Sequence, residues 1–383
     1  MNAPSSISPR SMKRPPPLPR SLHAMPDLYL GTSPETGEPI FVDLERHALT
    51  IAGSGAGKGV GQIIPNLRGP HAWDGSAVVI DPSGGTTALC ADWRAEHLGQ
   101  EIAILDPYGL CEHTAPQFRQ SVNVLDLAET SDNLHMLADG IVTRSTYDTQ
   151  PYFNNSAALV IAGMLAYILE AASTEGERHL GSLLPLLDLM QARNDALLDE
   201  MFACTRFRSL ASKAANRALN ESGGKGSVLD TVETQLKWLT YERMAEWVAQ
   251  PSTLDLHQLK NGRMTLFLVI PPDQLAAQGQ FLRLFTRLTM SIMQQQTPDG
   301  LDMGTPCLMV LDEFYSLGRM NEAQQAAAQM RKYGLHLWPF LQNWGQLTEL
   351  YGRAGAESFT SSADVTCFFG IGRTDEETLA KVS

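Results

Sequence analysis

The sequence predicts an α/β fold with a mostly parallel sheet and an all-α insertion in its middle. Short apolar segments alternate with helical stretches toward both ends of the 383-residue chain. Several of these segments are continuous apolar runs, which is typical of parallel strands covered by helices on both faces. Between about residues 125 and 251 the strand pattern stops, and apolar residues recur at helical spacing.

Each element follows from one of these two patterns. Strands are predicted at residues 49–52, 77–80, 102–105, 264–270, 308–311, 335–340 and 365–369. Helices are predicted within the insertion at residues 133–143, 156–172, 183–191, 197–202 and 228–239. The insertion is therefore expected to interrupt the sheet after its third strand along the chain.

The turn after the first strand has the composition of a phosphate-binding loop. It reads Gly53-Ser54-Gly55-Ala56-Gly57-Lys58-Gly59-Val60. Glycine accepts the positive φ angles that aim successive backbone N–H groups at an anion. A helix over about residues 58–67 adds its positive end, and Lys58 adds a charge for the β- and γ-phosphates. We predict an ATP site, although Ala52 and Gly59 depart from the usual Gly-x4-Gly-Lys-Ser/Thr pattern. A structural turn with an incidental lysine is the alternative.

An apolar run that ends in two acids supplies the second half of such a site. Residues 307–311 are followed by Asp312 and Glu313. Asp312 can hold Mg²⁺, usually through water, and Glu313 can polarise the water that attacks the γ-phosphorus. Solvated carboxylates are common at strand ends, so the acid pair indicates a nucleotide site only in combination with the loop at residues 53–59. Together they predict ATP and Mg²⁺ as cofactors, and ATP hydrolysis as the activity.

Composition excludes several classes of protein. A formal net charge of −13 argues against a basic surface coat, although it leaves room for a basic channel inside an assembly. The five cysteines are scattered and odd in number, which favours reduced thiols in the cytoplasm. The histidines form no His-Glu-x-x-His pattern, so no zinc site is predicted. The longest uncharged apolar run, residues 157–169, is shorter than the ~18–20 residues of a membrane span and predicts a buried helix.

The chain divides into three predicted parts. Residues 1–28 form a basic, Pro-rich tail without an apolar signal region, and we expect it to be disordered. A contact of this tail with lipid headgroups or a partner is the alternative. Residues 29–124 and 252–383 form the nucleotide-binding domain, and residues 125–251 form the inserted all-α domain.

An ordered series of segments resembles one known family. The series is Gly55-Ala-Gly-Lys58-Gly-Val-Gly61 with Ile63-Ile-Pro-Asn-Leu67, Ala77-Val-Val-Ile-Asp81-Pro82, Leu266-Phe-Leu-Val-Ile-Pro271-Pro-Asp273, Leu311-Asp-Glu-Phe314 with Leu317-Gly-Arg319, and Gln342-Asn-Trp-Gly-Gln-Leu347 with Tyr351-Gly352. It resembles the TraG/TraD-type coupling ATPases of type IV secretion and conjugation, from about Tyr29 to the C-terminus. The resemblance implies a RecA-like P-loop NTPase core.

The resemblance also implies residue roles. Lys58 would bind phosphate, Asp312 Mg²⁺ and Glu313 the attacking water. Gln342 would be a sensor that couples the γ-phosphate to its strand, with a satisfied core polar group as the alternative. Arg331 would reach the neighbouring subunit's site as an arginine finger in a homohexamer with sites between subunits. A solvated helix arginine is the alternative for Arg331.

Three departures from the family pattern bear on these roles. Family members usually carry membrane spans before the P-loop, and none is predicted here. The family's Asp-Pro-Lys-Gly-Glu is Asp81-Pro-Ser83-Gly-Gly85 in this chain, so one positive and one negative charge are lost beside the site. The chain stops at Ser383, soon after the last predicted strand, which leads us to expect a shortened protein or a fragment.

The leading functional interpretation is an ATPase motor. It would recruit a relaxase–DNA complex or an effector protein to the channel proteins of a type IV secretion system, with DNA as a further partner. One alternative is a nucleotide-dependent docking module with little hydrolysis, and another is a DNA pump of the FtsK/HerA kind. The expected location is the cytoplasm, with peripheral attachment to the bacterial inner membrane as an option.

Overall fold

The computed structural model describes residues 27–144, 151–171, 175–220, 227–320, 323–324 and 330–382. Its centre is a seven-stranded sheet in which every neighbouring pair is parallel, in the order β5-β6-β4-β7-β8-β3-β9. The strands are β3 (His47–Ala52), β4 (Ser76–Ile80), β5 (Glu101–Leu105), β6 (Met264–Leu268), β7 (Cys307–Leu311), β8 (Leu335–Leu341) and β9 (Ala363–Phe369). The predicted α/β class with a mostly parallel sheet is confirmed.

Helices cover both faces of this sheet, because its strands present apolar side chains on both sides. One face packs against α1 (Ile64–Leu67), α2 (Gly85–Leu98) and the first strand of a hairpin. The other face packs against α11 (Gly279–Gln294) and α13 (Trp344–Ser362). Short helices α10 (Gln258–Asn261) and α14 (Glu376–Val382) complete this part of the molecule.

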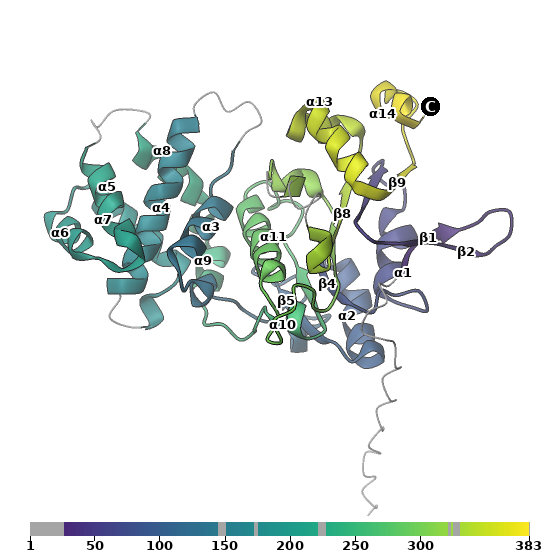
Figure 1. Ribbon diagram of the computed structural model, residues 1–383, viewed down its shortest axis with the longest axis horizontal. Helices are drawn as coiled ribbons and strands as arrows, with labels where there is room; N and C mark the ends of the chain where they lie inside the picture. The colour runs from purple at the N-terminus through teal and green to yellow at the C-terminus, as the bar shows by residue number, and fades with distance from the viewer. Residues whose placement is uncertain are drawn as a thin grey trace, which may run out of the picture.

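The hairpin precedes the sheet and was not predicted from the sequence. Strands β1 (Asp27–Thr32) and β2 (Pro39–Asp43) pair antiparallel, and the hairpin projects from one end of the molecule (Figure 1). The predicted tail boundary at residue 28 is therefore wrong by two residues, because Asp27 and Leu28 belong to β1. Leu28 is 0% exposed, and burial of its side chain fixes the start of the strand. The rest of the predicted tail lies outside the described residues.

Most of the chain between β5 and β6 is helical and lies at the end of the molecule opposite the hairpin (Figure 1). Its main helices are α3 (Ser131–Ile141), α4 (Pro151–Ala171), α5 (Leu183–Gln191), α6 (Asp195–Ala203), α7 (Arg206–Leu219), α8 (Val228–Leu236) and α9 (Glu242–Val248). Helix α4 is the one described helix that is long and apolar enough to cross a membrane. Most of its apolar residues are buried within the helical part, as a core helix requires.

The chain leaves and re-enters the sheet domain at one place. The Ser121 N–H donates to Thr253 Oγ1 at 3.0 Å, and the Asn123 N–H donates to Ser252 Oγ at 3.0 Å. These bonds tie the two crossing segments together. Residues 125–251 remain the proposed extent of the insertion, although its buried residues join the core of one sheet face without a break.

Candidate nucleotide site

The loop at residues 53–59 and the acids at 312–313 lie at the same edge of the sheet. The loop follows β3 and the acids follow β7, with β8 between these two strands. Because all three strands are parallel, their carboxyl ends meet at one edge, where ligands of open α/β sheets bind. The two predicted halves of the site thus stand on nonadjacent strands and still meet at this edge, as the contacts of Lys58 show. We call the space between the loop and the acids the cleft.

Lys58 joins the two halves. Its Nζ lies 2.8 Å from Asp312 Oδ1 and 2.9 Å from Glu313 Oε1. All three side chains are partly shielded, with exposed fractions of 18%, 22% and 29% in that order. A cation placed between two half-buried carboxylates offsets part of the cost of bringing these acids together. The loop and the acid pair are therefore joined by ion pairs into one unit, which consists of Lys58, Asp312 and Glu313.

The pKa values of this unit reflect burial and charge together. Burial acts to lower the pKa of Lys58, but the charges of Asp312 and Glu313 and their hydrogen bonds outweigh it, so this pKa lies above its ordinary value. Burial also raises the pKa of Asp312, although Lys58 opposes that rise. At neutral pH the lysine thus stays charged, while Asp312 depends on a neighbouring cation to remain ionised at low cost.

The loop is shaped by glycines at two kinds of position. Gly55 and Gly57 have φ of +72° and +89°, which only glycine adopts without strain. Gly53 is needed for close approach, since a Cβ on it would lie 2.3 Å from the carbonyl oxygen of Gly370, in the loop after β9. A side chain at either kind of position would distort the loop.

The backbone after Lys58 is helical, in agreement with the predicted range of residues 58–67. Residues 59–63 form a wide turn in which the Ile64 N–H donates to the Gly59 carbonyl oxygen, and α1 follows. Pro65 occupies the first turn of α1, where its missing N–H costs little. The result is a short helical segment whose N-terminus starts at the loop.

Glu313 has an unusual backbone that aims it at the loop. Its φ is +61°, a left-handed conformation that is rare for a residue other than glycine. The Ser316 N–H and hydroxyl both donate to the Glu313 carbonyl oxygen, at 2.9 and 2.7 Å, and so hold this conformation. Strain of this kind persists only where surrounding contacts enforce it, and it gathers at functional positions.

Gln342 lies at the same edge, directly after β8 and therefore between the loop and the acids. Its backbone N–H donates to Gln346 Oε1 at 2.8 Å, which fixes the turn from β8 into α13. The position fits a residue that connects the cleft with β8. Its predicted sensor role stays a prediction.

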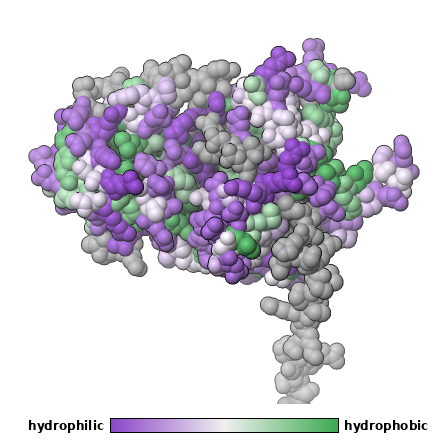
Figure 2. Space-filling model, viewed as in Figure 1, coloured by the Kyte–Doolittle hydropathy of each residue, from purple (hydrophilic) through white to green (hydrophobic). Residues whose placement is uncertain are grey.

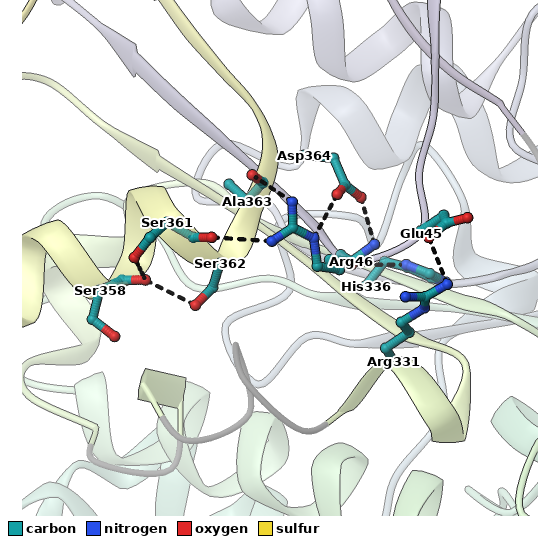
Figure 3. Close-up of polar contacts among 9 residues, drawn as sticks. All are labelled: Glu45, Arg46, Arg331, His336, Ser358, Ser361, Ser362, Ala363 and Asp364. Carbon is teal, nitrogen blue, oxygen red and sulfur yellow. Dashed lines mark hydrogen bonds and ion pairs between the residues drawn. The ribbon is translucent and has the colours of Figure 1, made fainter.

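The structure places Arg331 away from this cleft. It lies in the turn Met330–Tyr333 before β8 begins, hence at the opposite edge of the sheet. Its guanidinium pairs with Glu45 at 2.5 Å, and the two side chains are 58% and 51% exposed (Figure 3). An exposed pair of this kind contributes about 0–1 kcal/mol to stability. Arg331 is thus exposed at the surface, and its predicted role as an arginine finger stays a prediction.

A buried histidine stands next to this pair (Figure 3). His336 Nδ1 donates to the Arg46 carbonyl oxygen at 2.9 Å, and its Nε2 lacks a hydrogen-bond partner among the described residues. Burial lowers the pKa of His336 to about 4, against smaller opposing effects of the Arg46 carbonyl, Asp364 and Asp43.

This histidine should make the fold sensitive to acid. The unfolded chain binds a proton at His336 below pH 6.5 and the folded chain does so only below about 4. Stability therefore falls as the pH drops through this window, by about 3 kcal/mol in total. We expect His336→Gln to remove that part of the slope, measured by urea unfolding at pH 7, 6, 5 and 4. Equal slopes for both proteins would contradict a neutral buried His336.

The segment that departs from the family pattern, residues 83–85, lies in the turn between β4 and α2. Asp81 Oδ2 accepts from the Thr87 N–H and hydroxyl at 2.7 and 2.8 Å, so this acid anchors the start of α2. Between them, Ser83 donates to Asp81 and Gly84 has φ of +69°. This segment therefore forms an uncharged turn beside the cleft.

Sequence reasoning missed two buried polar residues on the helical segment after the loop. Gln62 and Asn66 are 4% and 0% exposed. The sequence did carry a signal for them. Polar residues are uncommon on the buried face of a helix, and where they occur there they are usually hydrogen-bonded.

Comparisons with known proteins agree with this fold. The model of a family described as "Type IV secretory system Conjugative DNA transfer" matches residues 12–383. Conjugal transfer protein TraG of Escherichia coli is 26% identical over 344 residues, covering 83% of this chain and 52% of TraG. Protein VirD4 of Agrobacterium fabrum is 25% identical over 351 residues, covering 88% of this chain and 49% of VirD4. The chain thus spans about half the length of the curated relatives that it matches.

Solved structures show the same fold. Plasmid coupling protein TrwB in complex with ADP and Mg²⁺ has a TM-score of 0.63 at 18% identity, covering 92% of this chain and 78% of TrwB. TrwB with a non-hydrolysable GTP analogue has a TM-score of 0.62 at 19% identity, with coverage of 92% and 77%. The predicted kinship with coupling proteins is confirmed: the chain belongs to the type IV secretory system conjugative DNA transfer family.

Proposed function

We propose that this chain binds ATP with Mg²⁺ and hydrolyses it, as part of a coupling protein that brings substrates to a type IV secretion channel. The observation that carries the proposal is the contact of Lys58, on the glycine loop, with Asp312 and Glu313. Three charged residues from two distant segments meet beside a loop shaped for phosphate. Family membership favours a coupling protein over a DNA pump of the FtsK/HerA kind.

The residues present fit a magnesium nucleotide. Lys58 already places one positive charge between the two acids, so the cleft is built to hold a cation next to the loop. Asp312 would hold the metal, usually through water, and the metal would offset charge on the phosphates. TrwB, which has the same fold, is described in complex with ADP and Mg²⁺.

Each residue then has a task. Lys58 would leave the acids and bind the β- and γ-phosphates, together with backbone N–H groups of residues 53–60. Glu313, freed from Lys58, would orient and polarise the attacking water. Gln342, directly after β8, would sense the loss of the γ-phosphate and change the position of that strand. The exchange of partners by Lys58 would link nucleotide binding to activation of Glu313.

Assembly and location form the finer part of the proposal. We propose a homohexamer in which Arg331 of one subunit reaches the cleft of the next, which its exposed position allows. Its partners would be a relaxase–DNA complex or an effector protein and the channel proteins, with DNA contacts mainly to phosphates. The names of two relatives, a conjugal transfer protein of Escherichia coli and a type IV secretion system-coupling protein of Bartonella henselae, support partners of this kind. The location would be the cytoplasmic side of the bacterial inner membrane.

The test is ATP turnover by the purified chain with Mg²⁺, alone and with single-stranded or duplex DNA. We expect turnover that rises with DNA, and self-association that increases with a non-hydrolysable ATP analogue. Sedimentation of the same samples would report the assembly. If equilibrium dialysis detects no ATP binding, the proposed function is wrong.

A docking module with little hydrolysis is the second candidate. It is favoured by the uncharged turn Ser83-Gly-Gly85, where the family pattern has Lys-Gly-Glu. ATP binding without turnover, even with DNA and in the assembled state, would select this candidate. Turnover that is abolished by a single change at Glu313 would exclude it.

A further inference from the structure

A line of buried polar side chains connects the helical segment after the loop with two other parts of the fold. It contains Asn66 and Gln62 of that segment, Thr50 of β3 and Trp338 of β8, all less than 5% exposed. Burying polar groups is costly unless they bond one another, so each bond in this line constrains its partners closely.

Asn66 attaches the segment to the hairpin. Its Oδ1 accepts from the Tyr29 N–H at 2.9 Å, and its Nδ2 donates to the Tyr29 carbonyl oxygen at 2.7 Å. Nδ2 also donates to the Gln62 carbonyl oxygen at 2.8 Å. The Asn66 amide thus forms hydrogen bonds with both the N–H and the carbonyl group of Tyr29, the same two groups that a neighbouring β-strand would bond. Asn66 makes the two shortest of the hydrogen bonds from this helix to β1, and Gln62 Nε2 adds a longer one to the Leu30 carbonyl oxygen at 3.5 Å.

Gln62 attaches the same segment to the sheet. Its Oε1 accepts from the Thr50 hydroxyl at 2.9 Å, and Thr50 Oγ1 accepts from Trp338 Nε1 at 3.0 Å. Trp338 belongs to β8, the strand that leads to Gln342. One hydroxyl group therefore connects the helical segment, β3 and β8.

The hairpin is poised to respond to this connection. Two-stranded ribbons are marginally stable by themselves, so their order depends on what they are attached to. Every residue of β2 is at least partly exposed, and Ile40 and Phe41 are 44% and 41% exposed. Figure 2 shows a hydrophobic area at the base of the projecting hairpin. The helical segment is itself short, with only four residues in α1, and relies on side chains to hold it.

We propose that Asn66, Gln62 and Thr50 are positioning residues that couple the nucleotide-site helix to the β1–β2 hairpin and to β8. Phosphate bound at the start of this helix orders the helix, and Asn66 passes that order to β1. The hairpin therefore reports the nucleotide state at a distance from the cleft. This inference rests on the proposed function, because it requires that nucleotide binds at residues 53–60.

Hydrogen–deuterium exchange of the full chain, with and without Mg²⁺ and a non-hydrolysable ATP analogue, tests the coupling. We expect the analogue to slow exchange in peptides covering residues 27–32 by about three- to tenfold in the wild type. In Asn66→Ala this slowing is lost, while the analogue still slows exchange at residues 53–60. Tyr29→Phe is the matched control, because it keeps the backbone groups that Asn66 bonds, and it should behave like the wild type.

Thr50→Val and Thr50→Ser form a second pair that decides the point if Asn66→Ala fails to fold. In the wild type we expect the analogue to slow exchange at residues 335–341 as well, because Thr50 bonds Trp338 of β8. Valine keeps the shape but removes the hydroxyl, so this slowing should disappear in Thr50→Val and persist in Thr50→Ser. Wild-type protein that binds the analogue without any change at residues 27–32 would overturn the coupling and leave the proposed function intact. A wild type that binds no analogue would overturn both. The coupling would also be refuted if the analogue still slowed exchange at residues 27–32 in Asn66→Ala and at residues 335–341 in Thr50→Val.

Discussion

Replacing Glu313 by glutamine is expected to lower ATP turnover by about 10²- to 10⁴-fold, the usual contribution of a general base. Glutamine has nearly the same shape, but it cannot take a proton from water. Lys58 keeps its contact with Asp312 at 2.8 Å, so the loop should retain its conformation. ATP affinity should therefore remain within a few-fold of the wild type.

Single-turnover hydrolysis and equilibrium binding measured on the same preparation separate these two effects. Glu357→Gln is a suitable control, since this acid is 55% exposed and, within the described part of the chain, pairs with Arg353 of α13 and Lys381 of α14. Its turnover should match the wild type. If Glu313→Gln hydrolyses ATP at an unchanged rate, another residue activates the water and the proposed role of Glu313 is wrong.

Replacing Lys58 by alanine is expected to weaken ATP binding by about 100-fold, because a charge-assisted hydrogen bond to phosphate is lost. It also leaves Asp312 and Glu313 without their cation. The pKa of Asp312, already raised by burial, should rise further once the lysine no longer opposes that rise.

The sign of the pH effect in this variant follows from linkage. An acid with a raised pKa in the folded state binds more protons there than in the unfolded state. Stability is therefore lost as the pH rises from the unfolded pKa of 3.8 through the folded value. Compared with the wild type, Lys58→Ala should thus lose more stability between pH 4 and pH 7 in the absence of nucleotide.

Urea unfolding at several pH values and ATP binding by dialysis would measure both effects. The double variant Lys58→Ala/Asp312→Asn is the matched control: it should regain stability at pH 7, because one of the two acids is gone, but not ATP binding. Wild-type ATP affinity in Lys58→Ala would exclude this loop as the phosphate site.

The parts of the site that could be predicted from the sequence are those set by local constraints. A turn with φ of +72° and +89° requires glycine at those positions, so Gly55 and Gly57 mark it within a few residues. Strand β7 and its two acids are likewise visible in one short segment, because a buried parallel strand must be apolar throughout. The family resemblance rests on the order of such segments along the chain.

Other features were missed because the sequence carries no local signal for them. Helix α7 contains Phe207, Arg208 and Ser209 with positive φ. None of these residues is glycine, so the sequence gives no sign of this conformation. The β1–β2 hairpin has an exposed second strand that lacks the alternation of a half-buried one. Both depend on what the rest of the fold offers for packing.

The sequence alone determined the fold class, the loop at residues 53–59, the acid pair and the family, since each is written in short segments whose backbone or burial allows few residue types. Only the tertiary structure decided that Lys58 lies between Asp312 and Glu313, more than 250 positions away, that Arg331 stands at the far edge of the sheet, and that Asn66 bonds β1. These facts depend on strand order, and strand order follows from packing among residues far apart in the chain, which no short segment encodes.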